Sequence, residues 1–154
     1  MDVKPDDPRR DDVVALLLEH LDDMRTTSPP ESIHALDVEA LAVPGITFVT
    51  ARDGDRLLGC GALKELAADH GEVKSMRTTA PARGRGVAGA ILGWLLADAH
   101  ARGLSRVSLE TGTQDYFAPA HRLYLRHGFV DCDPFGDYTL DPHSRYMTLA
   151  LHDA

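Results

Sequence analysis

The chain has 154 residues, a formal net charge of −8, 44% hydrophobic and 26% charged residues, so we expect a single globular domain over residues 1–154 with a sizeable core. An acidic chain without a long basic stripe is not expected to bind nucleic acid. The sequence has no apolar run of membrane-spanning length, no signal-peptide core at its start and no C-x-x-C pair, which predicts a cytoplasmic protein with reduced thiols and no membrane partner.

The first half of the chain predicts, in order, a strand, two helices and a β-hairpin. The second helix begins with a capping box at Ser28-Pro-Pro-Glu31. The turn of the hairpin is Asp53-Gly54. The predicted ranges are 1–4 for the strand, 11–25 and 29–41 for the helices, and 46–52 and 56–64 for the hairpin strands.

The second half predicts four strands and two helices, after a loop over residues 67–71. The longer helix ends well at Gly103. One face of this helix is apolar, with Val87, Ile91, Trp94, Leu95 and Ala99. The predicted ranges are 72–78, 105–110, 129–132 and 146–151 for the strands, and 86–102 and 119–127 for the helices. The resulting order, β-α-α-β-β-β-α-β-α-β-β, predicts an α+β or mixed α/β layer fold with a single parallel crossover.

The segment that joins the strand over residues 72–78 to the next helix is basic and rich in glycine. Gly84 and Gly86 allow close approach of a ligand, because they have no Cβ, and Arg83 and Arg85 add positive charge. The first turn of the helix presents unpaired backbone N–H groups and the positive end of the helix dipole. In a chain of net charge −8, this loop predicts a site for a phosphate or pyrophosphate.

Two patterns fit this loop. Gly84-Arg-Gly86-Val-Ala-Gly89, with Glu110 about twenty residues further on, satisfies the dinucleotide-binding fingerprint. However, five residues separate the predicted strand from its first glycine, and a single further βαβ unit would fit after the match. Arg83-x-x-Gly86-x-Ala88 instead resembles the Arg/Gln-x-x-Gly-x-Gly/Ala loop of the GNAT superfamily, the acetyl-CoA-dependent N-acetyltransferases.

A second motif strengthens this resemblance. Tyr124-Leu-Arg-His-Gly128-Phe129 is similar to the Tyr-x-x-x-Gly-Phe segment near the GNAT C-terminus. Both motifs stand in the family's order, and the resemblance extends from about Ile46 to Leu151. It implies the GNAT fold, a mixed α/β arrangement with a mostly antiparallel central sheet, one parallel pair of strands that splay apart, and helices on both faces.

The resemblance also implies how acetyl-CoA is held. The pyrophosphate is expected on the backbone of the loop and first helical turn, and the extended pantetheine arm on the backbone of the strand before it, as in strand addition. A backbone N–H, expected to be that of Met76, then faces the thioester oxygen. The expected cofactor-binding residues are Met76, Thr78, Arg83, Gly84, Arg85, Gly86, Val87, Ala88 and Tyr124.

Two carboxylates are candidates for the base that deprotonates the amine. Glu72 is the first choice, because several GNAT enzymes carry a catalytic glutamate on this strand. Strand alternation puts Glu72, Lys74 and Met76 on one face, with Val73, Ser75 and Arg77 on the other; equally, Glu72 could simply pair with Lys74 or Lys64. Glu110, at the end of the strand that splays away, is the rival, or it braces the turn after it.

Tyr124 matches the family's general acid, since a phenol can reprotonate a thiolate leaving group; the other interpretation is a hydrogen bond to the cofactor. Seven residues earlier, where many members have an asparagine that contacts pantetheine, this chain has Phe117. On the acceptor side, Met24, His34 and Glu110 are candidate contacts, against a structural role for each. The eight histidines show no metal-ligand spacing.

The sequence therefore predicts transfer of an acetyl group from acetyl-CoA to a primary amine, by direct attack in a ternary complex, with a small-molecule or amino-acid-like acceptor. A protein amine and a homodimer both stay open. Two other interpretations are an acyl-CoA-binding module without catalysis and a dinucleotide-binding protein.

Overall fold

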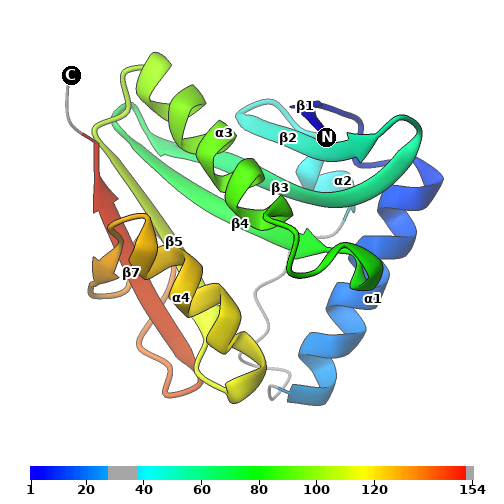
Figure 1. Ribbon diagram of the computed structural model, residues 1–154. Helices are drawn as coiled ribbons and strands as arrows, with labels where there is room; N and C mark the ends of the chain where they lie inside the picture. The colour runs from blue at the N-terminus through cyan, green and yellow to red at the C-terminus, as the bar shows by residue number, and fades with distance from the viewer. Residues whose placement is uncertain (28–37, 152–154) are drawn as a thin grey trace.

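The computed structural model describes residues 1–27 and 38–151, which form one seven-stranded sheet with helices on both faces (Figure 1). The sheet order is β1-β2-β3-β4-β5-β7-β6. The strands are β1 (Asp2–Pro5), β2 (Ile46–Asp53), β3 (Arg56–Ala67), β4 (His70–Thr78), β5 (Arg106–Gly112), β6 (Val130–Asp131) and β7 (Ser144–Ala150). The helices are α1 (Asp11–Thr27), α2 (Val38–Leu41), α3 (Val87–Ala101) and α4 (Ala118–Arg126), with 3-10 turns η2 (Ala80–Ala82) and η3 (Asp115–Phe117). The predicted order of strands and helices is confirmed within the described residues.

The pairing of the strands leaves an opening in the sheet between β4 and β5. All neighbouring strands pair antiparallel except β4 and β5, which run parallel. Their register begins at His70↔Arg106 and ends at Glu72↔Ser108. Beyond these pairs β4 and β5 separate, as Figure 1 shows, so the expected splayed parallel pair in a mostly antiparallel sheet is confirmed.

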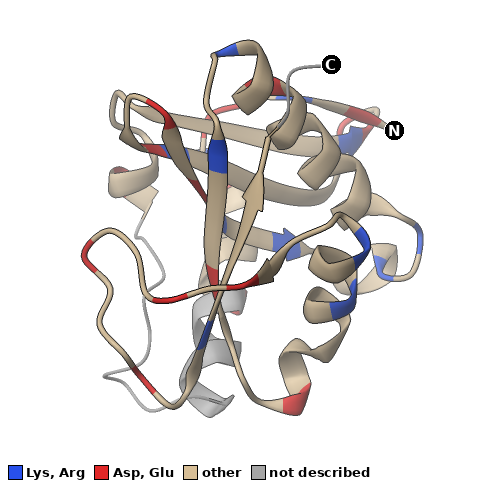
Figure 2. Cartoon of the chain, turned by 90° about the vertical axis from the view of Figure 1, so that its left-hand side faces the viewer, with Lys and Arg blue, Asp and Glu red and all other residues tan. Residues whose placement is uncertain are grey.

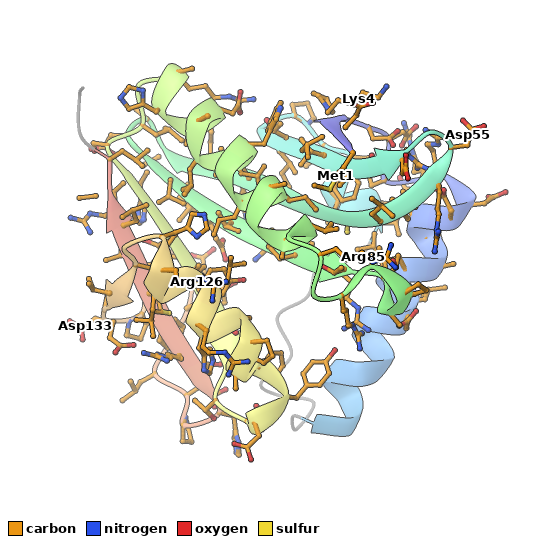
Figure 3. The ribbon with its side chains drawn as sticks, viewed as in Figure 1. Met1, Lys4, Asp55, Arg85, Arg126 and Asp133 are labelled. Atoms are coloured by element: carbon orange, nitrogen blue, oxygen red, sulfur yellow. The ribbon has the colours of Figure 1, made fainter. Side chains whose placement is uncertain are left out.

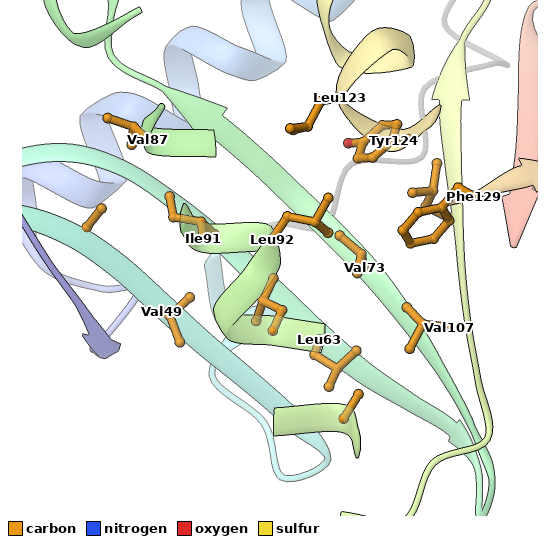
Figure 4. Close-up of a cluster of buried hydrophobic side chains, with 14 of the residues drawn as sticks. Val49, Leu63, Val73, Val87, Ile91, Leu92, Val107, Leu123, Tyr124 and Phe129 are labelled. Atoms are coloured by element: carbon orange, nitrogen blue, oxygen red, sulfur yellow. The ribbon is translucent and has the colours of Figure 1, made fainter. Parts of the chain in front are cut away.

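The core lies in two layers, one on each face of the sheet. On one face, α3 and α4 pack over β3, β4 and β5 (Figure 4); Val87, Ile91, Leu95 and Ala99, predicted as the apolar face of α3, are all buried there. Leu92 is buried as well, while Trp94 is only partly buried. On the other face, Val13, Leu16, Leu17 and Leu41 of α1 and α2 pack on Phe48, Cys60 and Ala62.

Some element boundaries differ from prediction. The loop predicted over residues 67–71 is wrong, because β3 continues to Ala67 and β4 begins at His70, which leaves Ala68 and Asp69 to make the turn. The capping box at 28–31 lies outside the described residues, and α2 is described from Val38. Among the described residues, no helix is both long and apolar enough to cross a membrane.

A β-bulge interrupts β4 and overturns the predicted side-chain alternation. Cys60 of β3 pairs with Arg77, but Ala62 pairs with Lys74, so two residues of β4, Ser75 and Met76, lie opposite one of β3. Ser75 has φ 56°, the one positive φ outside glycine among the described residues. The extra residue reverses the faces after it.

After the bulge, Met76 packs with Val73 in the α3 layer, and its Sδ lies over Gly61. Arg77 turns to the α1 layer, where it pairs with Glu19. The prediction that Met76 shares a face with Glu72, and Arg77 with Val73, was therefore wrong, because a strict period of two holds only in an unbulged strand.

Candidate active site

The glycine loop enters α3 with its backbone exposed. Gly84 and Gly86 adopt left-handed conformations, φ 78° and 79°, and open space lies where a Cβ would stand at either residue. Gly86 is the N-cap of α3 and makes no side-chain cap, and the first turn carries no acidic residue. Arg83 and Arg85 are exposed beside it, and Figure 3 shows Arg85 on the loop before α3. The free N–H groups and the two arginines suit an anionic ligand.

β4 leads from the opening to this loop. On its β3 side the strand is paired up to Thr78↔Gly59, but on its β5 side the pairing ends at Glu72. The described backbone from Val73 to Thr78 is thus a free edge, and the bulge at Ser75 and Met76 changes the direction of its N–H groups there. This is the segment in which the sequence placed the contacts of Met76 and Thr78 with the cofactor arm.

Glu72 lies at the closed end of the opening, inside a buried ion pair. Its Oε2 is 3.0 Å from Lys74 Nζ, and these side chains are only 3% and 9% exposed. The hydroxyl of Tyr138, from the connection between β6 and β7, donates to the same oxygen at 2.6 Å. Two donors on one oxygen stabilise the carboxylate. The alternative interpretation of Glu72, a pair with Lys74, is therefore what the structure contains.

Glu110 is the other carboxyl group of this face. It lies on β5, two residues beyond the last pair with β4, and pairs with Tyr146 of β7. Burial raises its pKa to about 7, with smaller upward effects from the charges of Glu72 and Asp141; the Ser144 hydroxyl and Lys74 act in the opposite direction. A carboxyl group with this pKa can exchange a proton near neutral pH.

Tyr124 projects from α4 into the buried layer between the two splayed strands. It is 7% exposed and belongs to the hydrophobic cluster that contains Val73 of β4 and Leu109 of β5. The centre of its ring lies 5.8 Å from the centre of the Phe129 ring (Figure 4). Burial, and secondly the charge of Glu110, raises its pKa to about 12. Among the described residues its hydroxyl has no hydrogen-bonding partner, so it is available to a ligand.

Phe117 is a packing residue. It is 9% exposed and its ring lies so close to Gly112 that a Cβ there would clash, at 2.2 Å. Phe117 thus anchors the turn between β5 and α4 by packing, at the position where the resemblance implied a polar contact with the cofactor.

Two residues of this region were not predicted from the sequence. Tyr138 lies in a Gly/Pro/Asp-rich connection without periodicity, and its contact with Glu72 spans 66 residues. Arg77 bridges Glu19 of α1 at 3.0 Å and Tyr116 of η3. Neither has a local signal, because each contact depends on the tertiary fold. Of the predicted acceptor contacts, Glu110 lies in this region, whereas the Met24 side chain and His34 lie outside the described part of the chain.

Comparison with known proteins agrees with this geometry. The model of the acetyltransferase (GNAT) family matches residues 13–129. The chain is 52% identical to an uncharacterized N-acetyltransferase, YedL, of Escherichia coli (strain K12), with 97% of this chain and 94% of the relative covered. It is 41% identical to the IAA acetyltransferase of Azospirillum brasilense, with 91% and 92% covered.

A solved structure shows the same architecture. A Klebsiella pneumoniae protein described as an acyl-CoA N-acyltransferase superposes with a TM-score of 0.80 at 25% identity, and the match covers 98% of this chain and 97% of that one. Acyl-CoA is the group donor of this family, and a splayed sheet with a glycine loop at its edge fits it. The chain therefore belongs to the GNAT family and is an N-acetyltransferase.

Proposed function

We propose that the protein transfers the acetyl group of acetyl-CoA directly to a primary amine of a small molecule or amino-acid-like acceptor, in a ternary complex. The observation that carries the proposal is the opening between β4 and β5. The free edge of β4 leads from there to the uncapped N-terminus of α3, and across the opening β5 carries Glu110, a partly buried carboxyl group with a pKa near 7. Such an opening suits an extended thioester between a phosphate site and a base.

The cofactor side of the proposal uses residues 76–88. The backbone of Gly84, Arg85, Gly86, Val87 and Ala88 would hold the pyrophosphate, with Arg83 adding charge. The β4 backbone at Met76 and Thr78 would hold the arm and offer an N–H group to the thioester oxygen as it gains negative charge. Support comes from the left-handed glycines, the open space above them, and the free edge of β4.

For the base, the geometry favours Glu110 over Glu72. Glu72 is already occupied by Lys74 and Tyr138, whereas Glu110 can accept a proton at neutral pH. The acceptor ammonium would give a proton to the Glu110 carboxylate, and its nitrogen lone pair would attack the thioester carbon. The nitrogen would lose its second proton to solvent as the tetrahedral intermediate collapses and the C–S bond breaks. The thiolate would take the proton of Tyr124, which regains a proton from solvent as Glu110 releases its own.

The acceptor face supports an amine. It carries Glu72, Glu110 and Asp141, with Lys74 as the cation among them, and further aspartates follow the connection between β6 and β7 (Figure 2). Carboxylates next to aromatic rings bind ammonium groups well. One relative is named for IAA, so IAA is the second acceptor class to be tested.

The test is a thiol-release screen with acetyl-CoA against primary amines, amino acids and IAA. We expect release with at least one amine, and its loss in Glu110→Gln at pH 7 with folding intact. Release with IAA and with no amine would overturn the acceptor class and leave acetyl transfer standing. Amine-dependent release that is unchanged in Glu110→Gln would remove Glu110 as the base.

A further inference from the structure

The acceptor face contains a buried cation whose purpose the transfer reaction does not explain. Lys74 Nζ contacts Glu72 Oε2 at 3.0 Å and the Tyr138 hydroxyl at 2.9 Å, and it lies 5.4 Å from the centre of the Tyr138 ring. The Tyr138 hydroxyl in turn donates to Glu72. Three polar groups, buried Glu72 and partly buried Lys74 and Tyr138, therefore satisfy one another in a closed ring. A buried ion pair of this kind is costly to form and is weak evidence for stability alone.

The position of Lys74 relative to Glu110 suggests its role. Glu72 pairs with Ser108 across the parallel ladder, so Lys74 and Glu110 are the next residues of the same face on either side of the opening. The Lys74 charge lowers the pKa of Glu110, while Glu72 raises it. One cation thus lies between two carboxyl groups.

We propose that Lys74 is a positioning residue for deprotonation of the acceptor, in which Tyr138 holds the Lys74 ammonium group between Glu72 and Glu110 so that Glu110 can work as a base at neutral pH. The inference rests on the proposed function and on the choice of Glu110 as the base. Lys74 itself touches no substrate in this scheme; it acts on Glu110 through its charge.

In the described part of the chain, the other charged or titratable groups whose electrostatics involve Glu110 are anions or phenols. These groups are Glu72 on β4, Asp141 before β7, Tyr146 on β7, Tyr124 on α4 and Tyr138 in the connection between β6 and β7. Removal of the Lys74 charge would therefore leave Glu110 among anions and phenols. Its carboxylate form would then be populated only at higher pH.

Tyr138 is placed firmly enough to hold this cation. Its ring packs against Phe135 at 5.2 Å and Tyr146 at 5.8 Å, and the Tyr146 hydroxyl donates to the Thr139 carbonyl at 2.7 Å. Burial, together with the charge of Glu72, raises the pKa of the Tyr138 hydroxyl well above its usual value. The hydroxyl thus stays protonated and keeps its hydrogen bond to Glu72.

The experiment follows the protonation of Glu110 directly. Side-chain carboxyl titration by 13C NMR, with the Glu110 signal identified by its loss in Glu110→Gln, is compared among wild type, Lys74→Met and Lys74→Arg. Lys64→Met is the matched control, because Lys64 stands opposite Glu72 on β3 but is not one of the main causes of the pKa shift of Glu110. We expect the midpoint of the Glu110 titration to rise by about one pH unit or more in Lys74→Met. The midpoint should return toward the wild-type value in Lys74→Arg and stay unchanged in Lys64→Met.

Activity gives a second readout. With one active amine, the acid limb of the kcat/KM profile should move to higher pH together with the Glu110 midpoint in Lys74→Met. This shift lowers kcat/KM about fivefold or more at pH 7 and lets it recover at high pH. A variant that had merely loosened the fold would expose Glu110 and move the midpoint downward. An unchanged or lower Glu110 midpoint in Lys74→Met would overturn the proposal.

Glu72→Gln keeps the inference testable if Lys74→Met does not fold. This variant removes the negative charge of Glu72, while the Lys74 charge still acts on Glu110. The midpoint of the Glu110 titration should therefore fall, and an unchanged midpoint would overturn the proposal. Failure of wild type to release thiol with any amine would instead overturn the proposed function, while the titration would still decide the role of Lys74.

Discussion

At the scale of the residue, Tyr124 combines burial with a free hydroxyl. Its raised pKa, about 12, keeps the phenol protonated throughout the neutral range, so it can donate at every working pH. We expect Tyr124→Phe to lower kcat by about 10²-fold and to change the Kd of acetyl-CoA little, since the ring and its packing on Phe129 remain. Steady-state kinetics and calorimetric titration measure the two effects; equal loss of affinity and kcat would make Tyr124 a binding residue instead.

The roles of the Glu110 and Glu72 carboxyl groups can be distinguished by substituting each with glutamine, which keeps the size of the side chain. Glu110→Gln should lower kcat/KM by about 10²- to 10³-fold at pH 7, and the loss should shrink as pH rises, because more of the amine is then already neutral. Glu72→Gln should stay within about tenfold of wild type, with its acid limb moved to lower pH. The measurement is a pH–rate profile of both variants with the same amine. A larger loss in Glu72→Gln would return the base to Glu72.

At the scale of the element, the two ends of α3 offer a matched pair of glycines. Gly86, before the helix, and Gly103, after it, have φ 79° and 80°, and a Cβ added at either residue would meet no other atom within 4 Å. A valine at either site carries the same left-handed strain, about 1–2 kcal/mol. We expect both variants to lose similar stability, but Gly86→Val alone to weaken CoA binding at least about tenfold, as measured by calorimetric titration. Equal affinities would place the phosphate site elsewhere.

The junction of β1, α1 and β2 depends on the partly buried carboxylate of Asp6. Burial alone would raise the pKa of Asp6, but hydrogen bonds from Thr50, the Asp7 backbone, Arg52 and Arg10 outweigh it and lower the pKa to about 2. The folded-state pKa lies below its usual value of 3.8, so this stabilisation is present above about pH 4 and is lost as pH falls toward 2.

We therefore expect Asp6→Asn to reduce the free energy of unfolding by about 1–3 kcal/mol at pH 7 and to flatten its decrease between pH 5 and pH 2.5. Urea unfolding at several pH values measures both effects. The exposed Asp53 is the control: Asp53→Asn should leave both the free energy and its acid slope close to wild type. If the free energy of unfolding of Asp6→Asn fell with pH as steeply as that of wild type, the assignment of this pH dependence to Asp6 would be contradicted.

The sequence allowed correct prediction of those elements whose signals are local. The apolar face of α3, the glycine loop at its start and the Asp53-Gly54 turn depend on propensity and spacing, and each lies where it was expected. The bulge at Ser75 could not be predicted, because a serine in the left-handed conformation has no sequence signature and is maintained by the surrounding sheet. The Tyr138 contact could not be predicted either, since only the folded sheet brings it to Glu72.

At the scale of the whole molecule, the bulge divides the site between the two faces of the sheet. It turns Met76 toward the layer of α3 and α4, where Tyr124 lies, while Lys74 and Arg77 stay on the face of α1. Tyr124, the proposed proton donor to the sulfur, and Glu110, the proposed base, thereby approach the opening from opposite faces. A thioester held along the β4 edge would have the amine on one side and the leaving sulfur's proton donor on the other.

This arrangement predicts that the cofactor stabilises the whole fold, because its proposed site joins β4, the glycine loop and α4. A ligand that binds the native state alone adds about 2.7 kcal/mol at 100 times its Kd, which corresponds to a rise in Tm of roughly 5–10 °C for a chain of this size. Differential scanning fluorimetry should show this rise with CoA and acetyl-CoA. NADH should give almost none, although Gly84-x-Gly86-x-x-Gly89 satisfies the dinucleotide pattern.

The glycine variants make this measurement specific to the loop. Gly103→Val should keep the full CoA-dependent rise from a lower starting Tm, whereas Gly86→Val should need at least about tenfold more CoA for the same rise, in proportion to its weaker binding. A rise with NADH that exceeds the rise with CoA would contradict the acyl-CoA site. An equal CoA response in both variants would show that the stabilising ligand binds away from the N-terminus of α3, and the free edge of β4 would then have to account for the binding without the helix dipole.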